Sequence, residues 1–242
     1  MESDEDDEET QASFCRFLDD NFKLPISVYA SSCVPKVKIK ERLHIMAYIT
    51  EQLIRKRFAD ERQIRHSNTR YFSATDIITE GRQIGDSVKT YDIFLSHSSN
   101  DKELIAGLKL LLQDMGYSIY VDWNDPALNP NHVTPQTAEV LRKRMAQCRS
   151  LIYAFSENAS NSKWMPWELG YFDALKNSRV AVLPIRQDAY KAYSGSEFVG
   201  LYHVIQKDNI KGKNEEALWV CDNEKYVFFD SWLNGSNPIK HN

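Results

Sequence analysis

The sequence predicts an α/β fold, in which a parallel β-sheet carries helices on both faces and follows a mainly helical N-terminal region. Two observations support this prediction. From residue 91 onward, short apolar segments alternate with segments of helical periodicity, and this alternation is typical of βαβ units on a parallel sheet. Before residue 90 the chain begins with an acidic run and contains a stretch of apolar residues at helical spacing. A chain of 242 residues has room for one large domain and an appendage.

The composition excludes several classes of protein. The net charge of −4 gives no overall basic surface for nucleic acid. No apolar run reaches the length of a membrane helix, and the acidic N-terminus does not resemble a signal peptide. The four cysteines lie far apart without a C-x-x-C pair, so neither a disulfide framework nor a zinc site is predicted. We therefore expect reduced thiols, no metal and a cytoplasmic location.

Two regions are predicted ahead of residue 90. Residues 1–12 are mostly acidic, and because like charges repel and bury no apolar surface, we expect a disordered tail rather than a docking segment for a basic partner. Residues 13–89 are predicted to be mainly helical and have no recognisable role. Between Pro35 and Phe58, apolar residues recur at helical spacing and predict a helix packed on the main domain. The polar stretch 80–90 is predicted to be a linker.

Residues 90–236 are predicted to form the α/β domain. Asn100, with Glu103 three residues later, is close to a capping box at the start of its first helix, and Gly116 suits the end of that helix. Thr134 followed by Pro135 predicts the start of the second helix. The expected strands are residues 91–96, 117–123, 150–156 and 180–185, while residues 225–230 fit either a late strand or a buried helical turn.

A site is expected where the carboxyl ends of the strands meet, because open parallel sheets bind ligands there. Three polar segments follow these strand ends: Ser96–Asp101, Asp122–Pro126 and Ser156–Trp164. Glu168 lies one turn into the next helix and can point at the same crevice. Neither a glycine-rich phosphate loop nor a G-x-S-x-G elbow occurs in the sequence, so a Rossmann dehydrogenase, a P-loop enzyme and an α/β-hydrolase are disfavoured.

Glu168 stands among aromatic residues in the segment S-K-W-M-P-W-E-L-G-Y-F-D-A. Trp164 is four residues earlier and therefore shares its helical face. The residues alone leave two interpretations open. Glu168 either extends to solvent while the tryptophans fill the core, or it serves as a functional carboxylate in a partly dry cleft. Pro166 is tolerable within this segment because the first helical turn has free amide donors.

Two motifs resemble the Toll/interleukin-1 receptor (TIR) domain family. Y-D-I-F-L-S-H-S-S-N-D at residues 91–101 is similar to the family's first box, in the spelling of its bacterial members. S-K-W-M-P-W-E-L at residues 162–169 is similar to its W-x-x-x-E-L helix. Residues 197–205 and 230–233 resemble the family's C-terminal part. The order of the elements also matches from Tyr91 to Leu233, which implies the flavodoxin-like TIR fold.

The resemblance implies cleavage of NAD+ between nicotinamide and ribose, in bacterial anti-phage defence signalling. The family's catalytic glutamate corresponds to Glu168 and its tryptophan to Trp164, and the loop that helps to hold NAD+ begins at Asp122 and Trp123. NAD+ would be substrate, with no cofactor, and self-association through the TIR domain or the N-terminal helix is expected. The candidate substrate-binding residues are Ser96, His97, Ser98, Asp122, Trp123, Trp164 and Trp167.

The chemistry of the bond suits a carboxylate among aromatics. Nicotinamide leaves as a neutral molecule while positive charge builds on the ribose, and a carboxylate in a dry cleft stabilises that charge. The products would be nicotinamide with ADP-ribose or a cyclic isomer. Two alternatives stay open: a non-enzymatic TIR assembly module, which can keep a glutamate at this position, and a nucleoside-processing glycosyl-transferring enzyme on a related sheet.

Overall fold

The computed structural model describes residues 46–66, 73–79, 90–122, 125, 134–191, 197–210, 212–213 and 215–241. These residues belong to one compact unit, Leu43–Asn242. The predicted acidic tail at residues 1–12 and most of the predicted linker at residues 80–90 lie outside the described residues.

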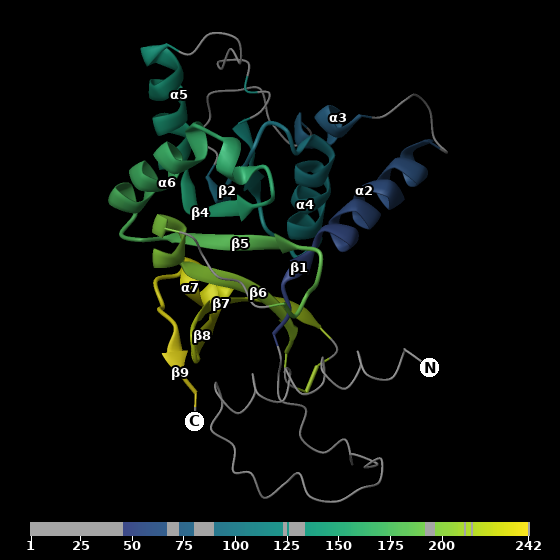
Figure 1. The fold of residues 1–242 in the computed structure, drawn as a ribbon, viewed down its shortest axis with the longest axis vertical. Coiled ribbons are helices and arrows are strands. Elements are labelled where there is room, and N and C mark those ends of the chain that lie inside the picture. Colours follow the sequence, from purple (N-terminus) through teal and green to yellow (C-terminus); the bar gives the residue numbers. More distant parts are fainter. Residues whose placement is uncertain are drawn as a thin grey trace, which may run out of the picture. The chain divides into compact units, whose positions relative to one another are not determined.

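Nine strands of the described chain form one mixed sheet (Figure 1). Its order is β3-β2-β4-β5-β6-β7-β8-β9, and β1 pairs with β5 beside this path. The strands from β1 to β6 pair in parallel, and β7, β8 and β9 extend the sheet antiparallel. The bounds are β1 Ile49–Thr50, β2 Tyr91–Ser96, β3 Ile119–Tyr120, β4 Cys148–Phe155, β5 Val180–Arg186, β6 His203–Asn209, β7 Glu216–Asp222, β8 Lys225–Phe228 and β9 Ile239–Lys240. The predicted parallel sheet is confirmed, while its antiparallel extension was not foreseen.

Helices cover both faces of the sheet, as predicted. The first face carries α2 (Glu51–His66), α3 (Ala74–Thr79), α4 (Lys102–Asp114) and α7 (Phe229–Leu233), and the second carries α5 (Pro135–Ala146) and α6 (Trp164–Leu175). Each face of the sheet has its own hydrophobic core, and the side chains of β2 alternate between them. Ile93 and Leu95 pack in the core of the first face, and Phe94 packs in the core of the second. Residues 225–230, which were predicted to form either a strand or a helical turn, contain both, since β8 leads directly into α7.

The ends of the helices follow the sequence signals in two cases of three. Thr134 caps α5 in a reciprocal capping box with Thr137, and Pro135 opens the helix. Gly116 follows α4 with a φ of +93°, a conformation that glycine adopts without strain. The predicted cap at Asn100 is wrong: α4 has Asp101 at its N-cap, and no side-chain hydrogen bond caps the helix. The Asp101 carboxylate instead binds the loop that follows β4.

The helix predicted between Pro35 and Phe58 is only partly correct over residues 46–58, and its first part, residues 35–45, lies outside the described residues. Residues 46–50 are not helical, and Ile49–Thr50 forms β1 beside β5. The helix begins at Glu51 and continues to His66. Burial of Ile49 in the sheet, where it is 1% exposed, outweighs the local helical pattern. The domain boundary at residue 90 stays a prediction, although β1, α2 and α3 share a core with the sheet.

Two residues of α4 allow it to pack closely against α2 and α3. A Cβ atom at Gly107 would lie 2.4 Å from the backbone oxygen of Ile54 in α2, so only glycine allows this approach. The buried Lys109 donates hydrogen bonds from Nζ to the backbone oxygens of Ile77 (2.6 Å) and Ile78 (2.9 Å) near the end of α3. These carbonyl oxygens are among those that a short helix leaves without an intrahelical partner, and a positive charge is favourable there.

Gly107→Ala is expected to destabilise the fold by about 1–3 kcal/mol, because the added methyl group must push α2 away from α4. Gly170→Ala on α6 is the matched control, since a Cβ there meets nothing within 4 Å, and it is expected to be neutral or stabilising by up to ~1 kcal/mol. Urea unfolding of both variants measures the difference. A Gly107→Ala protein as stable as the wild type would contradict the tight α2–α4 packing.

Candidate active site

Glu168 is a buried carboxylate that points from α6 toward the end of β2. The residue is 3% exposed, and its Oε2 accepts a hydrogen bond of 2.6 Å from the hydroxyl of Ser96, the last residue of β2. The helix begins at Trp164 and contains Pro166 in its first turn, where a missing amide proton costs no intrahelical bond. Of the two interpretations left open by the sequence, the solvent-exposed glutamate is therefore wrong.

The surroundings of Glu168 favour its protonated form. Burial, and secondarily the negative charge of Asp122, raise the pKa of this carboxyl from 4.5 to about 8, while the Ser96 hydrogen bond lowers it. A carboxyl group with this pKa changes its protonation near neutral pH. It can therefore ionise when a cation enters the site, since an opposite charge nearby favours the carboxylate.

His97 and Asp122 lie at the adjoining strand ends. The His97 side chain is only 4% exposed, and its Nδ1 lies 2.9 Å from the backbone oxygen of Leu95 and 3.8 Å from Asp122 Oδ1. The negative charge of Asp122 also raises the pKa of Glu168. The structure thus brings together four of the predicted site residues, namely Ser96, His97, Asp122 and Glu168.

The tryptophans of α6 pack with each other and with side chains of α5 and α6. Trp164 and Trp167 pack edge to face with centroids 5.4 Å apart, and Trp167 stacks on Tyr171 at 5.7 Å. The guanidinium of Arg142 lies 5.6 Å from the centre of the Trp167 ring and 5.7 Å from that of Tyr171. Trp167 therefore helps to hold α5 against α6 through cation–π contacts, and its predicted role in binding substrate stays a prediction.

Ser98 and Trp123 are the remaining predicted site residues. Ser98 is buried, and its hydroxyl accepts a hydrogen bond of 3.4 Å from the backbone nitrogen of Asn100, within the loop after β2. The hydroxyl therefore helps to shape this loop. Trp123 lies outside the described residues.

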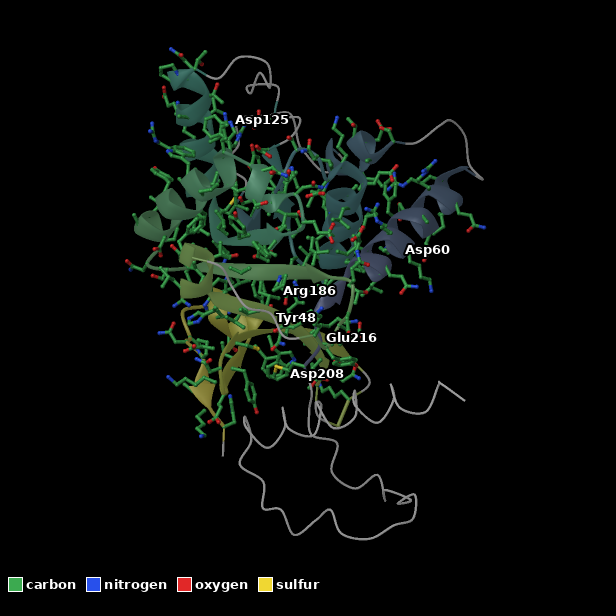
Figure 2. All side chains as sticks on the ribbon, in the orientation of Figure 1. Tyr48, Asp60, Asp125, Arg186, Asp208 and Glu216 are labelled. Atoms are coloured by element: carbon green, nitrogen blue, oxygen red, sulfur yellow. The ribbon has the colours of Figure 1, made fainter. Side chains whose placement is uncertain are left out.

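Sequence reasoning missed the anchor of the loop that follows β3. Asp125 is 3% exposed (Figure 2 labels its position). Its Oδ2 accepts hydrogen bonds from Tyr120 at 2.9 Å and from Arg144 of α5 at 2.7 Å. The contact joins residues 19 positions apart, and no local pattern in the sequence signals it. Since Asp125 lies three residues after Asp122, this anchor restrains the start of the loop that is expected to hold substrate.

A second missed contact connects the loops after β2 and β4. Asp101 accepts hydrogen bonds from Ser156 Oγ (2.5 Å) and Asn158 Nδ2 (2.6 Å). All three residues belong to polar segments that the sequence placed at the strand ends. The contact holds the chain just before α6, and thereby helps to position Glu168 against Ser96.

The arrangement suits stabilisation of a positive charge by one carboxylate. A buried carboxyl, a hydroxyl donor and a second carboxylate meet at the carboxyl ends of β2 and β3, which is the edge where open sheets bind ligands. Within the part of the chain that the structure describes, no group of three or more His, Cys, Asp or Glu side chains could hold a metal ion.

Comparison with known proteins identifies relatives of this chain. The sequence model of the TIR domain matches residues 93–217. The chain is 44% identical, over 164 residues, to a probable 3' cyclic ADP-D-ribose synthase, ThsB', of Bacillus cereus (strain MSX-D12), covering 66% of this chain and 84% of that protein. It is 33% identical over 85 residues to a putative cyclic ADP-D-ribose synthase, TIR2, of Cytobacillus dafuensis, covering 34% of this chain but 22% of that protein.

Glu168→Gln is expected to make the unfolding free energy less dependent on pH. In the wild type, the unfolded chain releases this proton near pH 4.5 while the folded chain holds it up to about pH 8. Stability is therefore fully present below the unfolded pKa and is lost as pH rises through the folded pKa. Near pH 8 the free energy of unfolding of the variant should exceed that of the wild type by at least the ~1.4 kcal/mol that one pKa unit represents. This difference should disappear near pH 4. Urea unfolding across this range measures the difference, and a constant difference would contradict the raised pKa.

Proposed function

Because the chain belongs to the TIR domain family, we propose that it is an NAD+ nucleosidase that cleaves the bond between nicotinamide and ribose. The products are nicotinamide and a cyclic ADP-ribose isomer or ADP-ribose, and the activity serves bacterial anti-phage defence signalling. The single observation that carries this proposal is the buried Glu168 carboxyl, hydrogen-bonded to Ser96 at the end of β2. The relatives named as cyclic ADP-D-ribose synthases support it.

The reaction needs a stabilised cation on the ribose. When the bond between the ribose anomeric carbon and the nicotinamide nitrogen breaks, both electrons of that bond go to the nitrogen, and nicotinamide departs neutral. The positive charge that remains resembles the oxocarbenium ion of other glycosyl transfers. Glu168 in its ionised form stabilises this charge, and the effect is strong because the carboxylate is shielded from water.

The binding of NAD+ itself favours the ionised form of Glu168. Its pyridinium ring carries a positive charge, and a cation near a buried carboxyl lowers the pKa of that carboxyl. The proton that Glu168 holds in the empty site is then released, and the carboxylate forms where it is needed. Asp122 has a related role in the proposal, because its negative charge attracts the same cation.

The cation is captured by one of two nucleophiles. Attack by water gives ADP-ribose and a proton, whereas attack by a hydroxyl or an adenine nitrogen of the same molecule gives a cyclic isomer. We favour cyclisation, because the relatives that support the proposal are named as cyclic ADP-D-ribose synthases. His97, Ser98, Trp123, Trp164 and Trp167 complete the proposed substrate-binding residues.

The wider setting of the enzyme is also part of the proposal. Among the described residues, no helix is long and apolar enough to cross a membrane. We propose a cytoplasmic enzyme that uses NAD+ as substrate without a cofactor and does not bind nucleic acid or membranes. Self-association through the TIR domain or the N-terminal region is proposed as well, and its signature would be a specific activity that rises with protein concentration.

Glu168→Ala is expected to reduce nicotinamide release from NAD+ by at least ~100-fold, because the charge on the ribose loses its main stabilising group. Chromatography with mass detection measures nicotinamide and identifies the second product as cyclic or open. Glu139→Ala is the control, since it removes an exposed helical carboxylate that pairs with Lys143, and it should keep wild-type activity. A fully active Glu168→Ala protein would contradict the proposal, and a wild type without activity at any protein concentration would favour the assembly module.

A further inference from the structure

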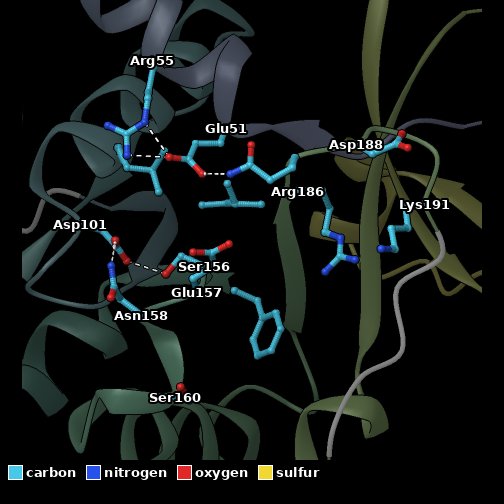
Figure 3. Close-up of a pocket in the computed structure, with 14 residues that line it drawn as sticks. Glu51, Arg55, Asp101, Ser156, Glu157, Asn158, Ser160, Arg186, Asp188 and Lys191 are labelled. Carbon is cyan, nitrogen blue, oxygen red and sulfur yellow. Dashed lines mark hydrogen bonds and ion pairs between the residues drawn. The ribbon is translucent and has the colours of Figure 1, made fainter.

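A cavity of about 570 Å³ opens at the carboxyl ends of β4 and β5, away from Glu168 (Figure 3). Its walls come from the start of α2, the start of α4, the loop after β4 and the loop after β5. This volume lies in the range of small-molecule sites, which is roughly 300–1,000 Å³. None of Glu168, Ser96 and Asp122 lines it.

The cavity borders both cores, since Phe155 in its wall packs against the second core. Leu104 and Ile185 form part of its wall, and both belong to the core shared with α2 and α4. Glu168 projects from α6, which packs with the other core. The hydrogen-bonded contact from Asp101 to Ser156 and Asn158 also lines the cavity. Because none of Glu168, Ser96 and Asp122 lines it, the cavity is a separate site at the same edge of the sheet.

Two cationic side chains face this cavity without an acidic partner. Arg186 ends β5, and Lys191 follows in the next loop. Neither side chain forms an ion pair or hydrogen bond with the residues that the structure describes. Figure 3 shows both side chains among the residues that line the cavity. Like charges in one cavity repel each other, and an anion that binds between them removes this cost. Arginine and lysine are also the side chains that most commonly bind phosphate.

The carboxylates at the cavity are mostly engaged elsewhere. Glu51 of α2 pairs with Arg55 and accepts a hydrogen bond of 2.6 Å from Gln187. Asp101 binds the loop after β4, and Asp188 accepts a hydrogen bond of 2.8 Å from the backbone nitrogen of Tyr190. Among the described residues, none of these carboxylates forms an ion pair with Arg186 or Lys191.

The opposite wall offers groups that suit a sugar and a base. Glu157 is exposed and has no hydrogen-bond or ion-pair partner among the described residues, so its carboxylate can accept bonds from ribose hydroxyls, as an acidic residue does in dinucleotide-binding folds. Phe155 is half-buried at the end of β4 and lines the same cavity. An aromatic ring in this position provides a surface on which a base can stack.

We propose that this cavity is a second ligand site that binds a nucleotide, with the phosphate on Arg186 and Lys191, the ribose on Glu157 and the base against Phe155. Part of the N-terminal region builds the site, because Glu51 holds Gln187 in the loop that carries Lys191. The contact of Asp101 with Ser156 and Asn158 lies between the nucleotide and the chain that leads to Glu168. The proposal concerns binding alone and does not depend on cleavage of NAD+.

Titration calorimetry of the full-length chain with AMP tests this site, because AMP has no nicotinamide bond and is not consumed by the proposed reaction. AMP should bind the wild type saturably, with at least ~10-fold weaker affinity in Arg186→Ala and in Lys191→Ala. Arg186→Lys should recover part of the affinity, which separates loss of charge from loss of structure. Adenosine and inorganic phosphate, tested separately, should each bind at least ~10-fold more weakly than AMP, since each lacks half of the contacts.

Two control variants make the test specific. Lys225→Ala removes an exposed cation on β8, far in sequence from the cavity, and should leave AMP affinity unchanged. Glu168→Ala should also leave the AMP affinity unchanged. If this variant weakens AMP binding as much as Arg186→Ala does, AMP occupies the catalytic site and the proposal is wrong. Absence of AMP binding at millimolar concentration, or equal affinity for AMP and inorganic phosphate, would also overturn it.

Discussion

The hydrogen bond between Ser96 and Glu168 is the interaction on which the proposed function depends. It joins the carboxyl end of β2 to α6, two elements that are 72 residues apart in the chain. The bond requires that β2 and β4 be neighbours, as their parallel register makes them, and that α6 pack its apolar residues on the second core. Packing thus forces an ionisable group out of water, and the cost of that burial is what raises its pKa to about 8.

Strand β1 and helices α2 and α3 of the N-terminal region contribute apolar side chains to the first core, as α5 and α6 do to the second. Strand β1 pairs with the end of β5, and α2 packs on α4 at Gly107, where no side chain would fit. Glu51 stands at the junction of these elements and binds the loop after β5. A region without a recognisable motif in the sequence therefore shapes one end of the sheet and one wall of the cavity at the ends of β4 and β5.

Local signals in the sequence predicted the features that depend on neighbouring residues. The bounds of β2, the Thr134–Pro135 start of α5 and the place of Pro166 in the first turn of α6 all agree with the structure. Contacts between distant segments could not be predicted in this way. The strand at Ile49, the use of Asp101 by the loop after β4, and the anchoring of Asp125 by Arg144 each depend on tertiary neighbours. Glu168 was identified because its motif is local, but its burial was evident only from the fold.

The central claim is that a buried Glu168, held near Asp122 and Ser96, is the group that stabilises the ribose cation. The most direct test is the pH dependence of kcat/KM for nicotinamide release, which reports the ionisation of groups in the free enzyme. The account predicts that kcat/KM rises with pH through an apparent pKa well above the 4.5 of an ordinary glutamate, and that Asp122→Asn shifts this rise to lower pH, because it removes a charge that raises the pKa. A kcat/KM that does not change between about pH 5 and 9 in either protein would contradict the account.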